Sequence, residues 1–335
     1  MSALAASTTL AAEKSGPIVD DSAYVHAHLL VEVEPGRRLN LYCTGKGSPT
    51  VVFDSGVTGE TVSWALVQPA VAKRTRACSY DRAGTGYSDP GTRTGTSANI
   101  VDDLHRLMKA ADIPPPYILV GHSYGGMNVR LYKDYFPSEV VGMVLVDPSH
   151  EDWVRRVWAL TPTQLTYEQY VAEGFEPMWR DERECLRAAT LGFVEGSELY
   201  KKCVPGPDPR FSDAVNAAYH KIYLSPAIYQ AALTEDENLH FESSDQLRMA
   251  RSWYGNMPLI VLAAGDRPNR RKDETQAHRE AVDRLRYVLF DELAALSTRG
   301  VNRVVPNTGH DIPLTQPVVV TDAVLEVLDQ ASKPA

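Results

Sequence analysis

The stretch YILVGHSYGGMNVRLYKDYF, residues 117–136, places a serine between two segments of different periodicity. The apolar run before it is typical of a buried strand, and the residues after it follow a helical pattern. Between them, GHSYG at 121–125 fits G-x-S-x-G, a sharp strand-to-helix turn that exposes a serine hydroxyl. The flanking glycines leave room where a β-carbon would collide with neighbouring backbone. We therefore predict that Ser123 is a nucleophile.

A serine hydroxyl is a weak nucleophile until a base accepts its proton, and nine histidines are candidates for that base. His310 is favoured because it lies in a Gly-His loop that follows a short predicted strand and precedes a closing helix. His122 is next to the serine but is expected to point elsewhere and to pack. His105 lies beside charged neighbours on a predicted helix over 97–111 and is expected to be solvated.

An acid must hold the imidazole in one tautomer and stabilise the cation that forms. Asp147 ends the apolar run VVGMVLV (140–146), and Asp266 ends the run PLIVLAAG (258–265). Asp147 could instead cap the turn before Pro148 as a structural residue. Both aspartates remain candidates for the triad acid, with Asp147 slightly favoured.

Apolar strands without polar alternation, separated by helices, predict a mostly parallel sheet with helices on both faces, an α/β fold. The pattern is interrupted at 151–255, which is helical in tendency and rich in bulky aromatic residues. Long insertions of this kind are usually lids or binding elements. We therefore predict a core over 23–150 and 256–335, a helical cap over 151–255, and a tail or signal remnant over 1–22.

The composition of the 335-residue chain narrows the class of function. Its formal charge of −9 argues against a nucleic-acid partner, and it has no apolar run long enough to predict a transmembrane segment. YDRAGTGYSD (80–89) lacks the P-loop lysine and is interpreted as a structural turn braced by Asp81 and Arg82. Cysteines and histidines at zinc-ligand spacing are also missing from the sequence. We expect no cofactor and no metal.

Three motifs resemble those of the α/β-hydrolase superfamily: GHSYGG at the turn, YDRAGTGYSDPG at 80–91, and VVPNTGHDIPLTQP at 304–317. The resemblance covers roughly 31–330 and implies the α/β-hydrolase fold with the triad order Ser, acid, His. Asp266 stands near the commonest acid location of the superfamily, although that location usually reads G-x-x-D. Asp147 resembles the acid of lipases and dehalogenases, which follows the preceding strand.

The resemblance also implies an oxyanion hole made of two backbone N–H groups. Tyr124, which follows the nucleophile, supplies one, and Val57 in the loop DSGVTGE (54–60) supplies the other. Relatives have histidine where Ser55 stands. The expected activity is hydrolysis of a small-molecule carboxylic ester through an acyl-enzyme. Epoxide hydrolases and dehalogenases are disfavoured because they carry aspartate in place of Ser123.

Other activities remain open on the same residues: amidase or peptidase, lactonase, carbon–carbon bond hydrolase, or a ligand receptor without catalysis. Trp64 and Trp153 are candidate walls of the substrate pocket. By the resemblance, Cys43 and Cys78 fall on neighbouring strands, and Cys185 and Cys203 both fall in the cap. Two disulfides, Cys43–Cys78 and Cys185–Cys203, are therefore plausible and would fit an exported protein.

Overall fold

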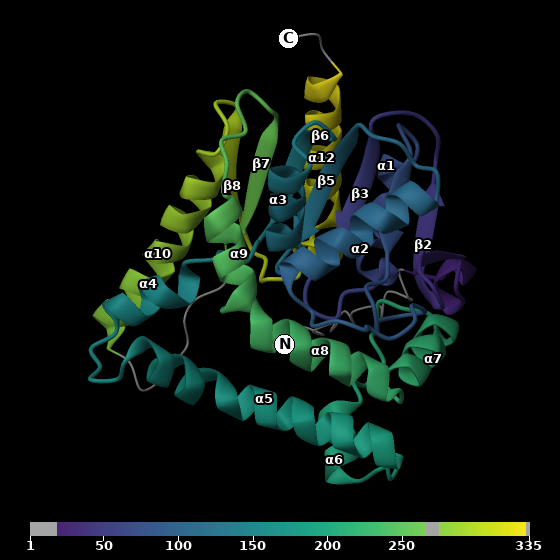
Figure 1. Ribbon diagram of the computed structural model, residues 1–335, viewed down its shortest axis with the longest axis vertical. Helices are drawn as coiled ribbons and strands as arrows, with labels where there is room; N and C mark the ends of the chain where they lie inside the picture. The colour runs from purple at the N-terminus through teal and green to yellow at the C-terminus, as the bar shows by residue number, and fades with distance from the viewer. Residues whose placement is uncertain (1–18, 266–274, 333–335) are drawn as a thin grey trace, which may run out of the picture.

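The computed structural model describes residues 19–265 and 275–332, in which eight strands form one sheet. Its order is β1-β2-β4-β3-β5-β6-β7-β8 (Figure 1). The strands are β1 (Leu29–Glu34), β2 (Arg37–Thr44), β3 (Thr50–Asp54), β4 (Ala77–Tyr80), β5 (Tyr117–His122), β6 (Val140–Val146), β7 (Leu259–Ala264) and β8 (Gly300–Val305). β2 runs antiparallel to β1 and β4, and the other neighbours are parallel. The predicted mostly parallel sheet is confirmed.

Helices cover both faces of the sheet, which explains the uniformly apolar strands. Val52, Leu119 and Met143 belong to one buried cluster, together with side chains of α2 (Ser97–Ala110), α3 (Gly125–Tyr135) and α10 (Gln276–Ala294). The alternate residues Val51 and Phe53 belong to the opposite cluster, together with α1 (Gln68–Val71) and α12 (Pro317–Ala331). Successive strand residues therefore serve opposite cores. Short segments η1 (Ser22–Val25), η2 (Thr61–Trp64) and α11 (Ile312–Thr315) complete this part.

Six helices connect β6 to β7: α4 (Trp153–Leu160), α5 (Tyr167–Leu191), α6 (Glu198–Cys203), α7 (Asp213–Ile222), α8 (Pro226–Leu239) and α9 (Glu242–Ala250). In Figure 1, α5 and α8 cross below the strands. α9 packs against α3, and its Leu247 is buried in the core cluster with Tyr124. This end of the predicted cap therefore belongs to the packing of the core.

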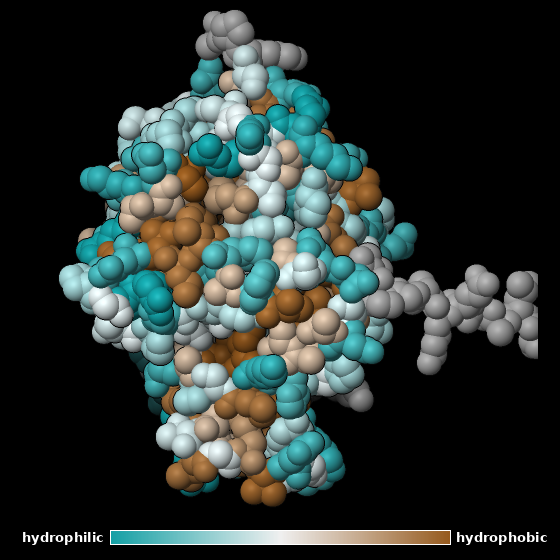
Figure 2. Space-filling model, turned by 90° about the vertical axis from the view of Figure 1, so that its right-hand side faces the viewer, coloured by the Kyte–Doolittle hydropathy of each residue, from teal (hydrophilic) through white to brown (hydrophobic). Residues whose placement is uncertain are grey.

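The lower lobe of Figure 2 carries apolar side chains at its surface. Near the α5–α6 connection, Leu191 and Val194 are largely exposed.

None of the helices in the described residues combines the length and the apolar character that crossing a bilayer requires.

Both predicted disulfides are present. Cys43 of β2 is bonded to Cys78 of the neighbouring β4, where the two residues are direct register partners. Cys185 of α5 is bonded to Cys203 of α6. Each bond therefore joins two adjacent elements. One bond lies in the sheet, and the other lies among the helices α4–α9 between β6 and β7, called the helical segment below.

Residues 1–18 of the predicted tail lie outside the described residues, but its last four residues are described. The Val19 N–H donates to the Arg210 carbonyl at 2.8 Å, and the Ser212 N–H donates to the Val19 carbonyl at 2.9 Å. The Val19 side chain is buried with Tyr24 and Val215. This part of the predicted tail is therefore packed onto the helical segment beside α7.

Candidate active site

Ser123 lies in the two-residue turn between β5, which ends at His122, and α3, which begins at Gly125. Its φ is +53°, a left-handed conformation that non-glycine residues adopt rarely. The turn is compact enough to require glycine on each side. A β-carbon on Gly121 would lie 2.5 Å from the Gly125 carbonyl oxygen, and one on Gly125 would lie 2.2 Å from the Asp54 carbonyl oxygen. The backbone thus has the strained geometry that the motif predicts.

The turn is anchored to β6 and to the loop that follows it. The Ser123 N–H donates to the Val146 carbonyl at 3.1 Å, and the Ser149 N–H donates to the Ser123 carbonyl at 2.8 Å. Because Asp147 follows Val146 directly, these bonds bring the ends of the two neighbouring strands together. Parallel strands end at the same edge of the sheet, so residues after β5 and β6 become neighbours there.

His310 and Asp147 are in direct contact at this edge. His310 Nδ1 lies 2.6 Å from Asp147 Oδ2, and Asp147 Oδ1 accepts the Ala264 N–H at 3.1 Å. Asp147 is 1% exposed and has a φ of +38°. Its carboxylate is therefore held between β7 and the imidazole. Asp266, the other acid candidate, lies outside the described residues.

His122 supports the loop that carries His310. Its Nε2–H donates to the His310 carbonyl at 2.9 Å, and the ring centroids are 4.6 Å apart. Burial, with a further contribution from His310, lowers the pKa of His122 to about 4, so this ring is neutral at pH 7. His105 stacks on Phe136 away from this site and faces Glu139 at 3.4 Å.

The two predicted oxyanion donors lie on different elements. Tyr124 is the N-cap residue of α3, and its hydroxyl forms 2.8 Å hydrogen bonds with the Gly95 carbonyl and Ser243 Oγ. The loop with Val57 follows β3 and lies against the serine. A β-carbon on Gly56 would be 3.2 Å from Ser123 Cβ and 3.6 Å from Ser123 Oγ.

A cavity of about 980 Å³ opens at the serine, with Asp147 and His310 also in its wall. Other wall residues come from the loop after β6, from α4, α5 and α10, and from the end of α8. Many are apolar: Trp153, Val154, Val157, Phe175, Leu239, Leu289 and Phe290. Trp153, a predicted wall of the substrate pocket, is thus part of the wall of this cavity. The prediction for Trp64 is wrong: this residue is fully buried and packs on Phe53 at a centroid distance of 4.8 Å.

Two features next to the site were not predicted as functional. Arg82 and Glu235 form a buried ion pair beside the Val57 loop, with Arg82 Nε 2.7 Å from Glu235 Oε1. His150 lines the cavity, and its Nδ1 accepts the Asp152 N–H at 3.0 Å. Arg82 could be anticipated as a brace because it belongs to the 80–91 motif. Glu235 carries no local signal, since its partners are far away in the sequence.

No group of His, Cys, Asp and Glu in residues 19–265 and 275–332 is arranged to hold a metal ion. The candidate site thus consists of a serine on a strained turn, a histidine–aspartate pair and backbone amides. This set of groups suits acyl transfer.

Comparison with known proteins supports the same architecture. A family model described as alpha/beta hydrolase fold matches residues 49–178. Protein YqjL of Bacillus subtilis is 34% identical over 108 residues, which are 32% of this chain and 43% of that protein. An AB hydrolase superfamily protein of Gibberella zeae is 31% identical over 107 residues, 31% of this chain and 33% of its own. The chain thus aligns with less than half the length of these relatives.

Among solved structures, epoxide hydrolase CorEH superposes with a TM-score of 0.63 over 90% of this chain and 97% of its own. The sequence identity is 16%, so this similarity concerns the fold and not the substrate. Three observations indicate the same fold: the sheet order, the turn at Ser123 and the family match over residues 49–178. The chain therefore has the α/β-hydrolase fold, and its residues 49–178 match the family model of that fold.

Proposed function

We propose that the protein is a serine hydrolase that cleaves carboxylic esters through an acyl-enzyme. The observation that carries this proposal is the 2.6 Å contact between His310 and Asp147, in the wall of the same cavity as Ser123. With Nδ1 facing Asp147, we infer that the other ring nitrogen, Nε2, exchanges the proton with the serine hydroxyl. This division of roles within the imidazole is what a Ser-His-Asp triad requires.

In the first half-reaction, Ser123 Oγ attacks the ester carbonyl carbon while His310 accepts the hydroxyl proton. The Tyr124 and Val57 N–H groups stabilise the negative oxygen of the tetrahedral intermediate. His310 then gives its proton to the departing alcohol, and the acyl group stays on Ser123. Water, deprotonated by His310, attacks the acyl-enzyme and releases the carboxylic acid and the free serine.

The segment between β6 and β7 is proposed to act as a cap that binds the substrate. Its support is the contribution of α4 and α5 to the cavity wall. The apolar side chains there, Trp153 among them, favour a substrate with an apolar acyl or alcohol group. A small-molecule ester of this type is the proposed substrate.

The two disulfides support a proposed location in an oxidising compartment. Disulfides persist in exported proteins and are rare in the reducing cytosol. We therefore infer export to the periplasm or the medium.

The test is labelling with a fluorophosphonate probe, combined with turnover of p-nitrophenyl esters of increasing chain length and of aryl amides. The wild type is expected to be labelled and to hydrolyse esters faster than amides, whereas Ser123→Ala loses both properties but stays folded. Faster amide cleavage would reassign the protein as an amidase. A wild type that is neither labelled nor active would instead support a non-catalytic receptor.

A further inference from the structure

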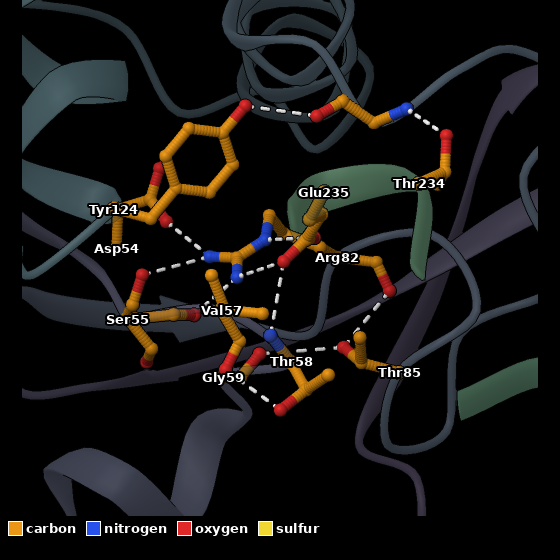
Figure 3. A network of polar contacts seen from close by, with 12 residues as sticks. Asp54, Ser55, Val57, Thr58, Gly59, Arg82, Thr85, Tyr124, Thr234 and Glu235 are labelled. Carbon is orange, nitrogen blue, oxygen red and sulfur yellow. Dashed lines mark hydrogen bonds and ion pairs between the residues drawn. The ribbon is translucent and has the colours of Figure 1, made fainter. Parts of the chain in front are cut away.

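The guanidinium group of Arg82 bonds the first part of the loop that carries Val57 (Figure 3). Arg82 Nη1 donates to Asp54 Oδ1 at 2.7 Å and to the Ser55 carbonyl at 2.8 Å. Arg82 Nη2 donates to the Gly56 carbonyl. Three successive residues of the loop are thus bonded to one rigid, planar group.

The remaining N–H groups of Arg82 are bonded to Glu235 of α8. Nε lies 2.7 Å from Glu235 Oε1, and Nη2 lies 2.9 Å from Oε2. Glu235 Oε2 also accepts the Thr58 N–H at 2.9 Å. Arg82 and Glu235 are 3% and 2% exposed, so water does not compete for these bonds. The pair therefore holds the loop both before and after Val57.

The Gly56 carbonyl and the Val57 N–H belong to the same peptide unit. Within the described residues the cis peptide bonds are Ser48–Pro49 and Pro115–Pro116. The Gly56–Val57 peptide is therefore trans, and its C=O and N–H point in opposite directions. A carbonyl bonded to Arg82 thus directs the Val57 N–H away from the guanidinium. A charged donor on the carbonyl also polarises the peptide and strengthens its N–H as a donor.

We propose that Arg82 and Glu235 are positioning residues that aim the Val57 N–H at the oxyanion, so that α8 of the helical segment helps to complete the oxyanion hole. This inference rests on the proposed function. It gives Glu235 a role beyond stabilising the fold, because its carboxylate connects α8 to the peptide next to the donor. The loop already lies on the serine, with the Gly56 β-carbon position 3.6 Å from Ser123 Oγ.

The test compares Arg82→Lys and Glu235→Gln with the wild type and with Arg37→Lys. An ammonium cannot reproduce the planar fork, and the Gln amide keeps the shape of Glu while losing its charge. Arg37 is a matched control because it forms another buried bidentate pair, with Asp103 at 2.6 and 2.9 Å. Three properties are measured: kcat and KM for an ester, inhibition by a boronic acid that forms a tetrahedral adduct, and Tm.

We expect kcat of Arg82→Lys to fall by roughly tenfold to a hundredfold, since loss of a whole oxyanion donor costs about 10²–10³. KM should change little, and the boronate should inhibit more weakly by a similar factor, because both effects report stabilisation of the tetrahedral state. Glu235→Gln should show the same pattern with a smaller loss. Arg37→Lys should keep wild-type kinetics even where its Tm falls.

The proposal is overturned if folded Arg82→Lys and Glu235→Gln keep kcat and boronate inhibition within twofold of the wild type. It is also overturned if both variants fail to fold, since the pair would then serve the fold itself. Failure of the proposed function gives a different result: the wild type itself would be unlabelled by a fluorophosphonate and inactive on esters.

Discussion

His310 Nδ1 lies 2.6 Å from Asp147 Oδ2, although the two residues are 163 positions apart in the sequence. The carboxylate is buried at the end of β6, and its other oxygen accepts the Ala264 N–H. This arrangement orients the imidazole from one side.

Asp147→Asn should lower kcat by about 10⁴ with little change in KM, because an amide presents the imidazole with the wrong hydrogen-bonding partner. Steady-state kinetics on a p-nitrophenyl ester would measure the loss, and Asp266→Asn provides the comparison. A larger loss in Asp266→Asn than in Asp147→Asn would reassign the acid.

Gly56→Ala should reduce kcat/KM by about tenfold without unfolding the protein. The added methyl would lie 3.2 Å from Ser123 Cβ and 3.6 Å from Oγ, so the serine must shift by a few tenths of an ångström, less than the displacement of about 1 Å that can cost a hundredfold. Gly206→Ala is the control, since its β-carbon meets no atom within 4 Å. Equal kinetics for the two variants would place the reacting hydroxyl away from this loop.

His122→Phe should lower kcat by roughly tenfold. It removes the hydrogen bond to the His310 carbonyl. Such a bond stabilises the position of the base by about 1 kcal/mol. His122→Gln keeps a donor and should recover part of the activity. If His122→Phe were as active as the wild type, the His310 loop would need no support from this bond.

The free energy of unfolding should decrease as the pH falls from about 6.5 to 4. Burial lowers the pKa of His150 to about 4, while Glu151, Asp152, Arg130 and Arg251 lie around its ring. In this pH window the unfolded chain binds a proton that the native ring does not bind, so acid favours unfolding, by up to about 1.4 kcal/mol per pH unit.

Urea titrations at pH 7 and pH 5 measure this change in stability. His150→Asn should reduce the difference between the two pH values, because the substituted side chain does not titrate. An identical pH dependence in His150→Asn and the wild type would show that other groups cause the loss.

Replacing Cys185 and Cys203 together by Ser should destabilise the helical segment by about 3 kcal/mol, since their bond closes a loop with a sequence separation of 18. Thermal unfolding with and without reductant would measure the effect, and the reductant should lower the Tm of the wild type. Intact mass after alkylation without reduction checks the premise: four alkylated thiols would refute both disulfides.

The sheet and its helices could be predicted from the sequence because their signals are local. Unbroken apolar runs such as those of β5 and β6 indicate strands buried on both faces, as the structure confirms. The signal for the turn at Ser123 is equally local, since glycines at 121 and 125 are required by the tight backbone on either side of the serine. The pairing of Cys43 with Cys78 depended instead on the resemblance to the α/β-hydrolase superfamily, which implies that their strands are neighbours.

Other features depend on contacts between distant segments. Trp64 has the residue type of a pocket wall, but its position after β3 places it in the core against Phe53. The pairing of Glu235 with Arg82 joins residues 153 positions apart and follows from how α8 crosses the sheet edge. No periodicity or motif around Glu235 distinguishes it as a functional residue. A single carboxylate on a helix usually faces solvent, so the sequence alone does not predict a buried ion pair there.

The sequence by itself determined the class of fold, the strained serine and the histidine loop, because short-range sterics and hydrophobic periodicity encode them. Tertiary structure brought Asp147 into contact with His310 and decided which charges hold the loop beside Ser123. Those relationships depend on where parallel strands end and on how the connecting helices pack over that edge. They arise only when distant segments are brought within hydrogen-bonding distance.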